Sequence, residues 1–182
     1  MTEGVDTAQL GGQALHRVVF GAEEVQARVR ELGREISATY TSADRLLVIG
    51  LLKGAFIFMA DLVREIRLPL HVDFLIASSY GDRKVSSGDV RLLYDTGVSF
   101  EGRAVLLVED IIDTGTTLKW LIPRLEAREP RSLDVCTLLH KRLAPLEVEP
   151  RWVGFDAPNE FLVGYGLDHA EDFRHLPYIA SI

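Results

Sequence analysis

Three short apolar runs, each followed directly by polar residues, constrain the fold of this 182-residue chain more than any other feature. The runs are LLVIGLL at 46–52, AVLLV at 104–108 and VCTLL at 135–139. Continuous apolar runs of this length are typical of strands in a parallel sheet that helices cover on both faces. Residues 22–40 have helical spacing, with apolar side chains at Val25, Val29, Leu32 and Ile36. The sequence therefore predicts an α/β fold with a mostly parallel central sheet flanked by helices.

Further segments fit the same alternation of strands and helices. Helices are expected in 54–66 and 116–128, the second with a bend at Pro123, and strands in 71–80, 90–96, 151–157 and 161–168. The segment SYGDRKVSSGD at 79–89 combines glycine, serine and charge, so it is predicted to be a long mobile loop. Residues 1–15 are expected to form a flexible tail, and residues 16–182 a single domain.

Composition excludes several classes of protein. The net charge of −7 does not support broad attraction to nucleic acid. No apolar run approaches the roughly 18 residues that indicate a membrane span, and the polar, glycine-rich start does not resemble a signal peptide. The single cysteine, Cys136, excludes an internal disulfide and is expected to be a buried thiol. We therefore expect a cytoplasmic protein that binds neither nucleic acid nor membrane.

Polar clusters follow several of the predicted strands. Lys53 and Gly54 follow the first run, residues 109–117 follow the second, Lys141 comes soon after the third, and Asp168 ends a later strand. In sheets of this kind ligands bind beyond the carboxyl ends of the strands. The sequence therefore predicts that these residues converge on one site.

The cluster after the second run, EDIIDTGTT, contains a turn that is suited to binding a phosphate and acids that would repel one. Gly115, the neighbouring hydroxyls and the amides at a helix start can bind a phosphate, although a helix start capped by Asp or Thr explains the same letters. Glu109 and Asp110 repel a phosphate, and they are either solvated acids or ligands for sugar hydroxyls or magnesium. A sugar phosphate would satisfy both the turn and the acids.

At this point the sequence resembles a known family. VLLVEDIIDTGTTL at 105–118 is similar to the phosphoribosyl diphosphate-binding motif of the type I phosphoribosyltransferases, and VEDIIDTG is closest to the hypoxanthine-guanine branch. The resemblance extends through LLKGAFIFMADLVREI, the 78–93 segment, REPRSLDVCTLLHK and VGFDAPNEFLVGYGLDHAEDFRHLPYI, and so from about Val18 onward. It implies the type I fold, with a small hood built from N- and C-terminal segments over the main sheet.

The resemblance also implies a role for each residue of the predicted site. Asp113 is the candidate general acid/base near the 7-nitrogen of the purine, although it could simply cap the helix. The phosphoribosyl diphosphate is expected to contact Lys53, Gly54, Glu109, Asp110, Asp113, Thr114, Gly115, Thr116, Thr117 and Arg174. Magnesium is expected at Glu109 and Asp110, beside the ribose hydroxyls, and a second magnesium, bound to the diphosphate, at Asp168. In relatives the peptide bond that corresponds to Leu52–Lys53 can be cis.

On the purine side, the resemblance assigns three residues. Lys141 would donate to the 6-oxo group, Phe161 would stack on the base, and Leu162 would offer backbone groups where relatives commonly have valine. From the residues alone, Lys141 reads as a surface charge and Phe161 as core packing. An ammonium only donates hydrogen bonds, so Lys141 favours a 6-oxopurine over adenine.

The resemblance therefore predicts a magnesium-dependent purine-salvage transferase, forming a homodimer or homotetramer. Ser79 and Tyr80 match the signature of a flexible loop that closes over the site. One alternative is a sister enzyme for another base, of which xanthine stays open. The other is a regulatory protein that senses phosphoribosyl diphosphate on the same fold, but the chain has Asp113 and lacks a basic DNA-binding segment.

Overall fold

A computed structural model describes residue 10 and residues 13–79, 90–143 and 145–182 of the chain. The larger sheet contains β2 (Leu47–Leu52), β3 (His71–Ser79), β4 (Val90–Tyr94), β5 (Ala104–Ile112), β6 (Ser132–His140) and β7 (Trp152–Asp156). The helices are α1 (Ala22–Thr39), α2 (Phe56–Glu65) and α3 (Thr116–Glu126), with a short 3₁₀ turn at Ser42–Asp44. The smaller sheet contains β1 (Arg17–Phe20), β8 (Leu162–Val163) and β9 (Ile179–Ser181).

The central sheet has six strands in the order β4-β3-β2-β5-β6-β7. All neighbouring strands are parallel except β3 and β4, so β4 is an antiparallel edge strand. The chain moves outward from β2 to β3 on one side and from β5 to β6 on the other. The direction of winding therefore changes between β2 and β5, which is where sheets of this type form a ligand crevice.

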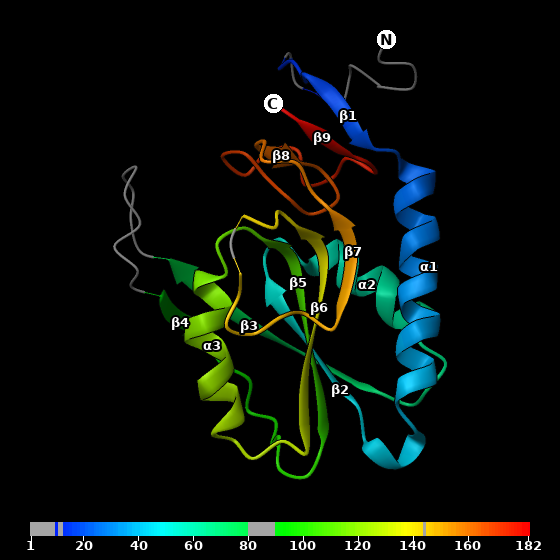
Figure 1. The fold of residues 1–182 in the computed structure, drawn as a ribbon, viewed down its shortest axis with the longest axis vertical. Helices are drawn as coiled ribbons and strands as arrows, with labels where there is room; N and C mark the ends of the chain where they lie inside the picture. The colour runs from blue at the N-terminus through cyan, green and yellow to red at the C-terminus, as the bar shows by residue number, and fades with distance from the viewer. Residues whose placement is uncertain (1–9, 11–12, 80–89, 144) are drawn as a thin grey trace.

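Helices cover both faces of this sheet (Figure 1). Apolar side chains of α1 and α2 pack with one face, in a buried cluster that includes Val29, Phe58 and Leu106. Apolar side chains of α3 pack with the other face, in a second cluster that includes Leu107 and Leu121. Alternate residues of β5 thus enter opposite clusters, as the period of a strand requires.

The small sheet joins the two ends of the described chain. Its order is β1-β9-β8, and both neighbouring pairs are antiparallel. In Figure 1 it lies at the top of the molecule, with the blue β1 beside the red β9. This is the hood that the family resemblance implied.

Most elements confirm the sequence-based expectations. Helix α3 continues through Pro123 to Glu126, and β5 extends two residues beyond the predicted strand, to Ile112. The strand predicted at 161–168 is shorter, because only Leu162 and Val163 pair with β9. The sequence did not indicate β1 or β9. In the part of the chain that the structure describes, no helix is long and apolar enough to cross a membrane.

Candidate active site

Three adjacent parallel strands end at one edge of the sheet, and a predicted site residue follows each of them. Strand β2 ends at Leu52, β5 at Ile112 and β6 at His140. The next residues are Lys53, Asp113 and Lys141. The structure therefore brings the three predicted clusters together.

Asp113 and Lys141 form a direct ion pair across this edge. Lys141 Nζ lies 3.2 Å from Asp113 Oδ2, and the backbone N–H of Lys141 donates to the carbonyl of Ile112 at 3.0 Å. The Lys141 side chain is only 11% exposed, whereas that of Asp113 is 52% exposed. Lys141 is thus not the solvated surface charge that the residues alone would suggest. The pair combines a largely buried donor with an accessible carboxylate.

The segment 114–117 forms a turn that opens α3. Gly115 has φ +75°, a left-handed conformation that glycine adopts readily, and its carbonyl accepts the N–H of Lys119 at 2.9 Å. The hydroxyls of Thr114 and Thr116 are 2.9 Å apart. A pocket of about 170 Å³ lies beside the turn, lined by Thr114–Thr116, Leu118, Lys119 and residues 145–148. Amides at a helix start together with hydroxyls are suited to a phosphate.

Glu109 and Asp110 lie within β5 and point to opposite faces of the sheet. Glu109 is buried, and its Oε2 has no hydrogen-bond partner among the described residues. Burial, followed by the charge of Asp110, raises the pKa of Glu109 well above its usual range. Burial also raises the pKa of Asp110 to about 6, while backbone N–H groups and Arg174 oppose that shift and Asp168 adds to it. Burial thus disfavours the ionised form of each acid, and a hydrogen-bond donor or a cation beside either carboxylate would stabilise its charge.

The Lys53–Gly54 segment packs tightly between β5 and the hood. A Cβ at Gly54 would fall within 3.0 Å of the Asp110 carboxylate, and a Cβ at Gly166 would fall within 3.0 Å of the Gly54 carbonyl oxygen. Gly166 also has φ +105°. The peptide bond between Leu52 and Lys53 is cis. Glycines at these two positions therefore allow three segments to meet.

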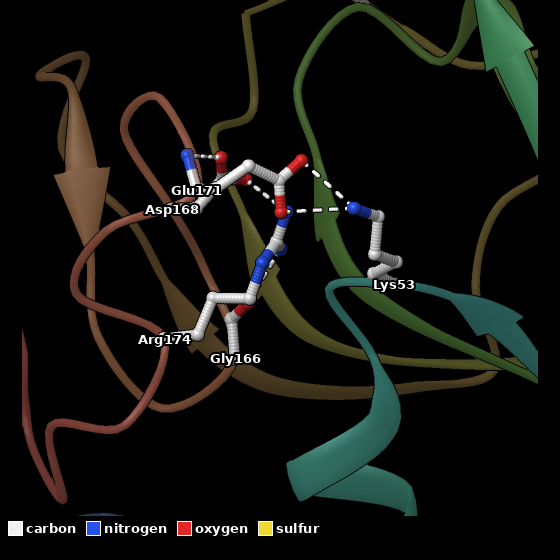
Figure 2. Close-up of polar contacts among 5 residues, drawn as sticks. All are labelled: Lys53, Gly166, Asp168, Glu171 and Arg174. Carbon is white, nitrogen blue, oxygen red and sulfur yellow. Dashed lines mark hydrogen bonds and ion pairs between the residues drawn. The ribbon is translucent and has the colours of Figure 1, made fainter.

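Four charged side chains form a cluster beside this segment, which we call the charged corner: Lys53, Asp168, Glu171 and Arg174 (Figure 2). Lys53 Nζ donates to both carboxylate oxygens of Glu171, at 2.8 and 2.9 Å. Arg174 Nη2 lies 2.8 Å from Asp168 Oδ1 and 3.3 Å from Glu171 Oε2. Hydrogen bonds from Lys53 and then Arg174 lower the pKa of Glu171. The corner thus holds two cations, each paired with an acid.

The predicted purine-stacking residue lies where β8 begins. The Phe161 side chain is 53% exposed, so its ring is accessible. It meets the ring of His169 edge to face, with the ring centroids 5.4 Å apart. Leu162 is buried and pairs with Ser181 of β9. An exposed, laterally supported ring is suited to stacking on a flat base.

The carboxylates of Glu109, Asp110 and Asp168 are suitable ligands for a hard divalent cation, although they do not form a complete set of ligands by themselves. The described residues contain no group of three or more acid, histidine or cysteine side chains that could hold a metal by themselves. Magnesium, however, is usually held by one or two carboxylates together with substrate phosphates and water. The unpartnered buried oxygen of Glu109 beside Asp110, and the nearby Asp168, are donors of this kind.

Sequence reasoning missed three residues of the site: Glu171, Gly166 and His169. The spacing in DHAEDFR places Glu171 three residues from both Asp168 and Arg174, which was the available signal for Glu171. Of the predicted loop signature, Ser79 ends β3, while Tyr80 and the rest of that loop through residue 89 lie outside the described residues.

Comparison with known proteins shows which chains this one is similar to. The family model described as a phosphoribosyl transferase domain matches residues 21–170. A hypoxanthine-guanine phosphoribosyltransferase of Mycobacterium avium is 49% identical over 181 residues, covering 96% of this chain and 89% of that protein. A hypoxanthine phosphoribosyltransferase of Salmonella typhimurium is 46% identical, covering 91% of this chain and 94% of its own. The crystal structure of a Bacillus anthracis hypoxanthine-guanine phosphoribosyltransferase, with a HEPES molecule in its active site, aligns with a TM-score of 0.86 at 40% identity, covering 93% of this chain and 99% of that one.

Proposed function

This chain belongs to the phosphoribosyltransferase family, and from that premise we propose that it catalyses a step of purine salvage. Hypoxanthine or guanine would react with phosphoribosyl diphosphate to give inosine or guanosine monophosphate and diphosphate. The names of the M. avium and S. typhimurium relatives support the substrate class. The observation that carries the proposal is the contact between Asp113 and Lys141.

That contact matches two neighbouring positions of one purine. The 6-oxo group and the 7-nitrogen lie on the same side of the ring system. A protein that binds this side therefore needs a hydrogen-bond donor for the 6-oxo group beside a proton acceptor for the 7-nitrogen. The Lys141 ammonium supplies donors only, and the Asp113 carboxylate 3.2 Å away can accept a proton. Adenine presents an amino group at the 6-position, which the ammonium would oppose. Phe161 would then stack on the base.

The proton and electron changes of the step can be assigned to these groups. As the 9-nitrogen of the purine bonds to the anomeric carbon, the bond from that carbon to the diphosphate oxygen breaks. Its electron pair leaves with the diphosphate, and the proton lost by the purine passes to Asp113. Lys53 and Arg174 would stabilise the negative charge on the departing group.

The rest of the sugar phosphate would be held by neutral and acidic groups. The amides and hydroxyls of 114–117 would bind the 5-phosphate, and the carboxylates of Glu109 and Asp110 would accept hydrogen bonds from the ribose hydroxyls. Glu109, Asp110 and Asp168 would hold magnesium, which when bound neutralises diphosphate charge and orients the substrate. If a chelator left turnover unchanged, the magnesium part of the proposal would be wrong.

The remaining proposals concern the whole chain. Residues 16–182 would form one domain, acting in the cytoplasm as a homodimer or homotetramer. Large apolar side chains are exposed on β3, β4 and the first residue of α2, which supports self-association there: Phe56, Val72, Phe74, Leu93 and Tyr94. Sedimentation as a monomer at micromolar concentration would contradict this part.

Replacing Asp113 tests the proposed chemistry. Asp113→Asn removes the proton acceptor but keeps the size of the side chain, so single-turnover nucleotide formation should fall by about 10²-fold or more. The affinity for phosphoribosyl diphosphate, measured by calorimetry, should change little.

Asp156→Asn provides a matched control. Asp156 is also an exposed carboxylate paired with a cation, Arg142, at the end of a neighbouring strand. The control should react at the wild-type rate. An unchanged single-turnover rate in Asp113→Asn would remove Asp113 from the proposed role.

A further inference from the structure

Glu171 contacts both cations that the proposed function assigns to the diphosphate. Figure 2 shows its carboxylate between the Lys53 ammonium and the Arg174 guanidinium. Both carboxylate oxygens accept from Lys53, at 2.8 and 2.9 Å, so two of the three ammonium donors are directed at Glu171. The second of these oxygens also lies 3.3 Å from Arg174 Nη2.

The loop between β8 and β9 holds Glu171 in this place. The N–H of Glu171 donates to Asp168 Oδ2 at 2.9 Å, and Arg174 Nη1 donates to the carbonyl of Gly166 at 2.9 Å. Gly166 itself packs against the Gly54 backbone, immediately after Lys53. Glu171 has φ +71°, in the left-handed region that residues other than glycine adopt rarely. The loop therefore turns back on itself and faces its acid toward the Lys53–Gly54 segment.

An anion that binds the same donors must compete with this carboxylate. The Lys53 and Glu171 side chains are 62% and 64% exposed, so the pair is accessible to a ligand and weak enough to be exchanged. Arg174 is different, because its side chain is only 18% exposed and Asp168 also holds it, at 2.8 Å. Displacement of Glu171 would thus free Lys53 fully while leaving Arg174 anchored.

We propose that Glu171 is an internal competitor of the diphosphate group, which weakens diphosphate binding and so favours its release after the reaction. The proposal rests on the proposed function, because that function places the diphosphate at Lys53 and Arg174. Glu171 is a positioning residue in this account, since it acts through the two cations. The effect should be confined to ligands that carry a diphosphate.

The test compares binding of two ligands by calorimetry in the presence of magnesium. In Glu171→Gln, inorganic diphosphate should bind roughly three- to tenfold more tightly than in the wild type, the range for losing one or two exposed ion pairs. Inosine monophosphate, which lacks the diphosphate, should bind with unchanged affinity. Product inhibition by diphosphate should strengthen by the same factor.

Asp172→Asn is the matched control for local charge. Asp172 is exposed, adjacent to Glu171 in the same loop, and its carboxylate accepts from Gln13 at 2.9 Å. This variant loses the same charge and should bind diphosphate no more than about twofold more tightly. In a Lys53→Met background, Glu171→Gln should lose most of its effect, because the main competing pair is gone.

Several outcomes would overturn the inference. Equal or weaker diphosphate binding in Glu171→Gln would mean that Glu171 organises the corner without competing. An equal gain in diphosphate affinity in Asp172→Asn would mean that the loss of any negative charge in this loop has the same effect. If neither the wild type nor the variants bind diphosphate, the inference is wrong, and failure of the wild type to form nucleotide would separately contradict the proposed function.

Discussion

The two regions that we propose to bind anions, the turn at 114–117 and the charged corner, are built in opposite ways. The turn at 114–117 offers hydroxyls and amides at the start of α3, and Lys119, which lines the pocket beside the turn, is an exposed side chain paired with Glu147. The charged corner offers full charges, and each of its cations is already paired with an acid. A neutral cradle requires no exchange of partners when a phosphate binds, whereas the corner must exchange one anion for another. The difference suits a phosphate that stays on the product and a diphosphate that must leave.

The largest expected effect concerns how tightly each region is packed. Gly166→Ala should lower the free energy of unfolding by about 2–5 kcal/mol, because its Cβ would meet the Gly54 backbone at a positive φ. Gly115→Ala should cost only about 1–2 kcal/mol, since its Cβ would meet the flexible end of Leu146. Urea unfolding of both variants measures this. Equal losses of stability would mean that the backbone around Gly166 is packed no more tightly than that around Gly115.

A second effect concerns Asp110, the partly buried acid beside the corner. The pKa of Asp110 is raised from 3.8 to about 6, so the folded chain holds this proton more tightly than the unfolded chain. Stability from this group is therefore present below pH 4 and is lost as the pH rises to about 6. Asp110→Asn removes the ionised form and should stabilise the chain at pH 8 by up to about 3 kcal/mol, at about 1.4 kcal/mol for each unit of pKa.

Thermal unfolding with a chelator present, at pH 4 and at pH 8, measures this difference. The stabilising effect of Asp110→Asn should be near zero at the lower pH. A gain that did not depend on pH would show that the ionised Asp110 is not the cause. The same variant should lose ribose binding, so that the acid would favour function at the expense of stability.

The residues at the sheet edge could be predicted from the sequence because each strand and its end are marked by neighbouring residues in the chain. A strand buried on both faces must be apolar, and the polar residues that follow it lie toward the sheet edge, which placed Lys53 and the 109–117 cluster there. Within that cluster, however, β5 continues through Glu109 and Asp110, so that Asp113 is the first residue beyond the strand. Their chemical roles came from the family resemblance. The residues alone would have left Lys141 a surface charge, whereas in the structure its side chain is only 11% exposed and contacts Asp113.

The hood could not be predicted in the same way. Its strands β1 and β9 have four and three residues, too few to show a period of two. Tyr165, Ala170, Glu171 and Phe173 all have positive φ without being glycine, and no sequence pattern marks such positions. The contact of Glu171 with Lys53 spans 118 residues of sequence and depends on this backbone path. It was therefore visible only in three dimensions.

The most direct test of the account is nucleotide formation from four bases. The chain would be incubated with magnesium, phosphoribosyl diphosphate and hypoxanthine, guanine, xanthine or adenine in turn. We predict turnover with hypoxanthine and guanine and none with adenine, because Lys141 only donates hydrogen bonds. No turnover with any base, despite tight binding of phosphoribosyl diphosphate, would contradict the account and indicate a protein that senses this ligand.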